Sequence, residues 1–170
     1  MSLFRKNIEN RITTDQNADW DYLIDNFYRD SGDLPDIIFE NCGIDDWKKF
    51  VDLVNDKYKV QFKLYEDESV TEKINFDTVN EFWNGNLEDG CMASVFTDNI
   101  QFNIFFGRQD EIDHDFDRRE IKNFEDHKKM INYLNDICNV LDKEAAIYAE
   151  GTEEILLARV SKDEVKYYNK

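Results

Sequence analysis

The sequence CMASVFTDNIQFNIFFGRQDEIDHDFD occupies residues 91–117 and contains three strand-like segments in succession. The first two, residues 91–97 and 100–106, flank Asp98-Asn99, and two central residues of this type suit a tight hairpin turn. Residues 107–109 then lead into the third segment. The stretch predicts an antiparallel meander of strands.

Four carboxylates occupy alternate positions of the third segment: Glu111, Asp113, Asp115 and Asp117. Alternate side chains of a strand point to the same face of a sheet. We therefore expect a ladder of negative charge on one face and Ile112, His114 and Phe116 on the other.

Helical patterns lie on both sides of the meander. Apolar residues recur at helical spacing near Trp20–Phe27, over 44–57, over 76–83 after a possible N-cap at Asn75, and in a long segment that starts near Asn123. Further strand patterns cover residues 58–65, 145–150, 154–160 and 165–168. Trp20, Leu23, Ile24 and Phe27 form the expected buried stripe of the first helix.

Strands and helices do not alternate regularly, which argues against a parallel doubly wound sheet. We predict an α+β fold: a single domain over 1–170, with a mainly antiparallel sheet of five to seven strands and three or four helices packed on one face. Residues 1–16, the only basic end of the chain, are expected to be a loose N-terminal segment.

The chain is strongly acidic, with 38 acidic and 21 basic residues and a formal net charge of -17. A hydrophobic content of 41% nevertheless argues against disorder. Negative charge repels nucleic acids and anionic membranes, so we expect neither as a direct partner. It attracts cationic surfaces, although solubility alone also explains an acidic composition.

The expected location is cytoplasmic. Three cysteines, an odd number without C-x-x-C spacing, indicate free thiols in a reducing compartment. No apolar run approaches the roughly 20 residues of a membrane helix. The first residues, MSLFRKNIENRITTD, lack the apolar core and cleavage site of a signal peptide.

Sequence signatures of catalysis are absent: there is no dinucleotide-binding, phosphate-loop or nucleophile-elbow motif. His114 points away from Asp113 and Asp115 in a strand, so these three cannot converge on a metal ion. The D-x-D-x-D pattern fails the calcium-loop template, because Arg118 and Phe124 stand where Gly and Glu are required. We expect no catalytic residue, no metal site and no cofactor.

The ladder has three possible explanations. It can be a solvated strand face with edge-protecting charge, a surface that engages a basic partner, or part of an active site. Arg108, Arg118 and Arg119 flank it in the sequence, and internal pairing with them would weaken the partner hypothesis.

The segment FFGRQDEIDHDFDRREIKNFEDHKKMINYLNDICNVLDKEAAIYAEG combines an aromatic strand, an acidic strand, an amphipathic helix and a strand that ends in Glu-Gly. This pattern, over roughly residues 100–160, resembles the small acidic α+β immunity proteins encoded beside bacterial polymorphic and contact-dependent toxins. The resemblance implies a cytoplasmic inhibitor that binds a cognate toxin. Toxin nucleases are often basic because they hold phosphates.

Our leading hypothesis is a non-enzymatic immunity protein that binds a basic toxin domain one to one, and we expect that domain to be a nuclease. The predicted partner-binding residues are Glu111, Asp113, Asp115 and Asp117, with Asp19, Asp21 and Asp25 of the first helix as a second patch. Two alternatives stay open: a nucleic-acid mimic that serves a phage or mobile element against host defence, and a small metal-dependent hydrolase.

Overall fold

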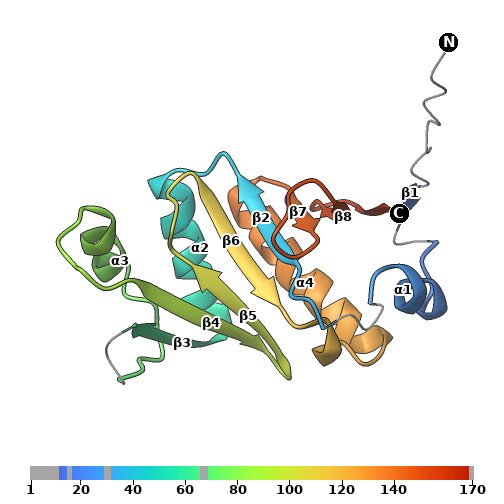
Figure 1. The fold of residues 1–170 in the computed structure, drawn as a ribbon, viewed down its shortest axis with the longest axis horizontal. Helices are drawn as coiled ribbons and strands as arrows, with labels where there is room; N and C mark the ends of the chain where they lie inside the picture. The colour runs from blue at the N-terminus through green and yellow to red at the C-terminus, as the bar shows by residue number, and fades with distance from the viewer. Residues whose placement is uncertain (1–11, 15–16, 29–31, 66–68, 169–170) are drawn as a thin grey trace, which may run out of the picture.

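The computed structural model describes residues 12–14, 17–28, 32–65 and 69–168, and these form one antiparallel sheet with helices packed on one face (Figure 1). The strands are β1 (Ile12–Thr14), β2 (Asp36–Glu40), β3 (Lys59–Leu64), β4 (Cys91–Thr97), β5 (Ile100–Phe105), β6 (Glu111–Phe116), β7 (Ala145–Tyr148), β8 (Leu156–Val160) and β9 (Val165–Tyr168). The helices are α1 (Trp20–Asn26), α2 (Ile44–Lys57), α3 (Phe76–Trp83) and α4 (Phe124–Leu141), with a short 3-10 helix, η1 (Arg118–Glu120).

The sheet confirms the α+β class and its antiparallel character, but it has nine strands where we expected five to seven. Its order is β1-β9-β8-β7-β2-β6-β5-β4-β3. The strands that the sequence did not indicate are β1 and β2. The second is central: β2 pairs with β6 on one side and β7 on the other, and so joins the meander to the C-terminal strands.

The sequence did not predict β2, because both faces of this strand are covered. Ile37, Ile38 and Phe39 are all buried, so apolar and polar residues do not alternate. A run of three apolar residues carries no period by which a strand can be told from a helix.

The N-terminal segment differs from expectation where the structure describes it. Ile12–Thr14 is not loose, because it forms β1 and pairs with β9 in the register Thr13↔Tyr167. The rest of the predicted segment, residues 1–11 and 15–16, lies outside the described residues.

Two long helices, α2 and α4, cover one face of the sheet (Figure 1). Trp47, Phe50 and Val54 of α2 are fully buried, as the helical spacing predicted. From α4, the ring of Tyr133 stacks on Phe102 of β5 with 4.2 Å between centroids. Each aromatic side chain buried on this face removes a large apolar area from water.

The shorter helices lie at opposite ends of the molecule (Figure 1). Trp83 of α3 donates a hydrogen bond from Nε1 to the Phe106 carbonyl over 2.7 Å. In α1, Leu23 is buried but Ile24 is 41% exposed, so the predicted stripe was wrong at Ile24. This helix has seven residues, and it buries only the side that packs on α4 and β9.

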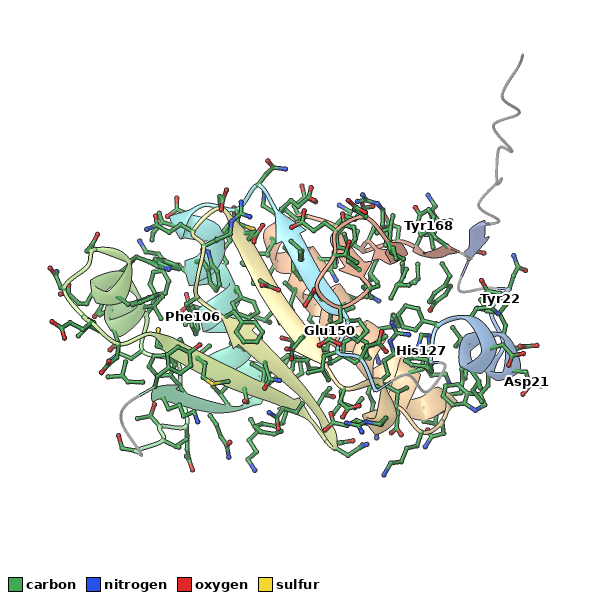
Figure 2. All side chains as sticks on the ribbon, in the orientation of Figure 1. Asp21, Tyr22, Phe106, His127, Glu150 and Tyr168 are labelled. Atoms are coloured by element: carbon green, nitrogen blue, oxygen red, sulfur yellow. The ribbon has the colours of Figure 1, made fainter. Side chains whose placement is uncertain are left out.

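A buried histidine of α4 contacts both the segment that follows α1 and strand β9. The imidazole of His127 lies 2.6 Å from the Tyr28 hydroxyl at Nδ1 and 2.9 Å from the Tyr167 hydroxyl at Nε2. Figure 2 shows His127 facing the end of α1.

The three cysteines are free, and Cys91 and Cys138 are buried. Within the described ranges, we find no helix whose length and apolar character would let it cross a membrane.

Candidate functional site

The acidic ladder lies on the face of the sheet that carries no helix, which we call the open face. Ile112, His114 and Phe116 of β6 are fully buried on the helix side, whereas Glu111, Asp113 and Asp115 are half-buried on the opposite side. The predicted two-sided strand is therefore confirmed. Figure 1 is drawn looking onto the open face, with α2 and α4 behind the sheet.

Asp117, the fourth predicted member, does not belong to the ladder. β6 ends at Phe116, and Asp117 is the N-cap of η1, where it accepts a hydrogen bond from the Arg119 backbone N–H over 2.8 Å. The Arg119 guanidinium also lies 2.7 Å from Asp117 Oδ2, and this hydrogen bond lowers the pKa of the carboxyl group. Asp117 is thus neutralised within the chain.

The flanking arginines leave the middle of the ladder unpaired. Arg108 pairs with Glu111 at 3.3 Å and also with Asp110. Arg118 is buried and points elsewhere, to Asp33 at 3.0 Å. Internal arginines therefore pair with Glu111 and Asp117. Among the described residues, no arginine or lysine pairs with Asp113 or Asp115, which lie between them.

A third aspartate joins these two from the neighbouring strand. Asp36 of β2 stands directly opposite Asp115 in the register of the sheet. We call Asp36, Asp113 and Asp115 the acidic centre. Among the described residues, no lysine, arginine or histidine forms an ion pair with any of the three.

The acidic centre is held by neutral donors. Asn103 Nδ2 donates to Asp115 Oδ1 over 2.7 Å, and the Gly151 backbone N–H donates to Asp36 Oδ2 over 3.0 Å. The Asp113 carboxylate receives no hydrogen bond from any described residue, and its Oδ1 is buried. A buried carboxylate oxygen without a donor is costly, which makes Asp113 the least satisfied acid of the surface.

Burial and mutual repulsion change the acidity of this group. Burial raises the pKa of Asp113 to about 7, and the charges of Asp36, Glu111 and Asp115 add to the rise. The pKa values of Asp36 and Asp115 are also raised, in both cases mainly by burial. At neutral pH, the acidic centre therefore holds part of a proton that an added cation would displace.

The connection between β7 and β8 extends the negative charge across β2. It runs in front of β2 on the open face, where Figure 2 shows Glu150. Glu150 accepts a hydrogen bond from the Leu34 backbone N–H over 3.1 Å. A hollow of about 440 Å³ opens between this connection and β6, and Asp113 and Glu153 both line it.

The second predicted patch lies apart from the first. Asp19, Asp21 and Asp25 are all exposed on or beside α1, and Figure 2 shows Asp21 at the outer end of the molecule. Asp19 also caps α1, because its Oδ1 accepts from the Tyr22 N–H over 2.8 Å. The structure does not bring these acids onto the open face.

His114 is a core residue, as strand geometry predicted. Its ring packs edge-on against Phe50 and Tyr133, and neither ring nitrogen has a partner among the described residues. Burial lowers the pKa of His114 to about 3. In the described part of the chain, no group of three or more His, Cys, Asp or Glu side chains is arranged to hold a metal ion.

Sequence reasoning missed Asp36, because its place beside the ladder depends on the pairing of β2 with β6, across about 75 residues of chain. It also could not name the aromatic side chains on this face. The alternation in QFNIF was the available signal, because it places Gln101, Asn103 and Phe105 on one side of β5.

Comparison of the chain with protein-family models, with curated protein sequences and with solved structures gave no match.

Proposed function

We propose that this protein is a cytoplasmic inhibitor of the immunity type, which binds a cationic toxin domain through the open face. The observation that carries the proposal is the acidic centre: Asp36, Asp113 and Asp115 are adjacent on the open face and form no ion pair with any described lysine, arginine or histidine, whereas Glu111 and Asp117, on either side, each have one. The proposed partner supplies the missing lysine or arginine side chains.

Physical considerations support a cation at this place. Three neighbouring carboxylates repel one another, and partial burial strengthens that repulsion. A lysine or arginine placed among them relieves it and favours the ionised forms. Binding near neutral pH should consequently release protons.

The net charge of -17 supports the same partner by a longer-range effect. A strongly negative protein collides more often with a basic one, and this steering weakens as salt is added. For an inhibitor of a toxin inside the producing cell, fast association is an advantage.

The direct test begins with the neighbouring genes: where one of them encodes a large protein with a basic, nuclease-like C-terminal domain, that domain is co-expressed with this protein. We expect growth to be rescued, and the two proteins to co-purify as a one-to-one complex. Failure both to rescue and to co-purify would refute the immunity function, whatever the chemistry of the open face.

The contribution of the open face is tested by charge reversal. Asp113→Lys with Asp115→Lys should slow association with the toxin domain by about tenfold or more at low salt. The matched control is Asp52→Lys with Asp56→Lys, because these exposed aspartates of α2 lie on the helix side of the sheet and change the net charge equally. Equal slowing in both variants would mean that net charge alone matters.

The α1 patch is tested in the same way with Asp21→Lys and Asp25→Lys. If this pair slows association and the open-face pair does not, the docking surface lies at the α1 end of the molecule. Since the two patches are separate, the two results can be distinguished.

A further inference from the structure

Beside the acidic centre, the open face carries apolar side chains that pack into no core. Met92 and Phe96 of β4 and Phe105 of β5 are half-buried and point away from the helices. They belong neither to the main core nor to the small apolar cluster around Ile38 and Tyr148. Apolar groups next to a polar patch are typical of the centre of a protein interface.

The two phenylalanine rings of this face differ: a cation lies on the ring of Phe96, and no described cation lies on that of Phe105. Lys59 Nζ lies 5.4 Å from the ring centroid of Phe96. Within the described residues, no cation and no aromatic ring contacts Phe105. Phe96 therefore shows how a cation sits on a phenylalanine of this face, and Phe105, which stands opposite Met92 in the register of β4 and β5, has no such cation among the described residues.

Phe105 and Asp113 are direct neighbours across the pair β5 and β6, in the register Phe105↔Asp113. Side chains in directly opposite positions have Cβ atoms about 4.5–5.5 Å apart. An aromatic ring without a described cation and a carboxylate without a described hydrogen-bond donor thus stand side by side on the open face.

We infer that Phe105 and Asp113 together form a subsite that binds an arginine side chain of the partner in preference to lysine. This inference rests on the proposed function, and it names the side chain that the acidic centre receives. The selectivity comes from Phe105, and the attraction to any cation comes from the acids.

The chemistry of arginine fits both neighbours at once. A guanidinium group is planar, so it can stack on the Phe105 ring while its N–H groups donate to the Asp113 carboxylate. A lysine ammonium is a compact and strongly hydrated charge, which gains the attraction of the carboxylate but less from the ring.

The other charged groups that face Asp113 all favour a cation. Asp36 comes from β2, Glu111 and Asp115 from β6, and Glu153 from the β7–β8 connection. All are acidic, and Arg108 is engaged by Asp110 and Glu111. No described cation competes for the subsite.

The test compares hexa-arginine and hexa-lysine peptides as probes of the full chain, by titration calorimetry at low salt. We expect hexa-arginine to bind the unmodified protein about 3- to 10-fold more tightly than hexa-lysine. Phe105→Leu should remove that preference and leave hexa-lysine binding unchanged. Phe96→Leu is the matched control and should keep the preference, because the ring of Phe96 is already covered by Lys59.

The outcomes separate this inference from the function on which it rests. Equal binding of the two peptides, with both weakened by Asp113→Asn, would overturn arginine selection and leave the cationic docking surface intact. Binding of both peptides that is insensitive to Asp113→Asn and to Asp115→Asn would overturn the docking surface itself. Unchanged circular dichroism and thermal midpoints would show that each variant is folded.

Discussion

The substitution Asp113→Asn should stabilise the protein at alkaline pH. In the folded chain, burial and three neighbouring acids raise the pKa of Asp113 from 3.8 to about 7. Between these two values the folded protein keeps a proton that the unfolded chain has released. Raising the pH through this window therefore lowers the free energy of unfolding. Asparagine has the same shape, carries no charge and is free of this cost.

The size of the effect follows from the same numbers. A rise from 3.8 to about 7 corresponds to an upper limit of roughly 4 kcal/mol above pH 7. Water reaches part of the side chain and screens the repulsion, so we expect about 1–2 kcal/mol. For a chain of this length, that corresponds to an increase of about 2–8 °C in Tm.

The assay is thermal unfolding followed by circular dichroism, for the variant and the unmodified protein, at about pH 8 and at about pH 4. The gain in Tm should be present at the higher pH and become small at the lower one, where Asp113 is protonated in the folded state and about half protonated in the unfolded chain. Asp117→Asn is the matched control: it removes the charge that pairs with Arg119 and keeps a side-chain oxygen that can cap η1, so it should lower Tm slightly at the higher pH and not raise it.

Two results would refute this reasoning. A lower Tm for Asp113→Asn at about pH 8 would mean that the charge is satisfied in the folded state by a group outside the described residues. An equal gain at both pH values would mean that asparagine stabilises by packing, and not by removing charge repulsion.

Two further predictions concern the core. His114 stays neutral in the folded protein, because burial lowers its pKa from 6.5 to about 3, whereas the unfolded chain takes up a proton below 6.5. On acidification from about pH 7 to pH 5, His114 should therefore lower the free energy of unfolding, opposite in sign to the contribution of Asp113 over the same range. In urea unfolding at the two pH values, the change on acidification should be more favourable for His114→Leu than for the unmodified protein; equal changes in both would contradict the assignment. Tyr28→Phe and Tyr167→Phe each remove a hydroxyl beside His127 and should each lower the free energy of unfolding by about 1–2 kcal/mol. Chemical denaturation of the two single variants and of the double variant measures this loss. A change near zero in the free energy of unfolding of both single variants would show that these hydroxyl groups do not stabilise the fold.

Much of the fold could be predicted from local patterns. The bounds of α2, α3 and the β4–β5 hairpin follow closely from helical spacing, from the Asn75 cap and from the turn at Asp98-Asn99. These features depend on neighbours a few residues apart, so the sequence displays them directly. The same holds for the two-sided character of β6.

The errors have two causes. Ile38 of β2 packs against Ala146, Tyr148 and Leu156 of β7 and β8, and Ile37 and Phe39 belong to the main core on the other face, so the sequence of β2 shows no alternation. Asp117 continues the alternation of the ladder in sequence, yet the chain turns there into η1, and Arg119, two residues away, pairs with it. Distant segments decide the first case, and a local turn decides the second.

For the candidate site, the sequence by itself determined which acids share a face, because the side chains of a strand alternate whatever the strand pairs with. It could not determine which of those acids have a cation. Arg108 and Arg119 pair with acids two or three residues away at the two ends, but only the tertiary structure directs Arg118 to Asp33 and sets Asp36 and Phe105 beside the remaining two aspartates. The physical reason is range: alternation is a property of one strand, whereas charge compensation depends on every chain segment that folds to within a few ångströms.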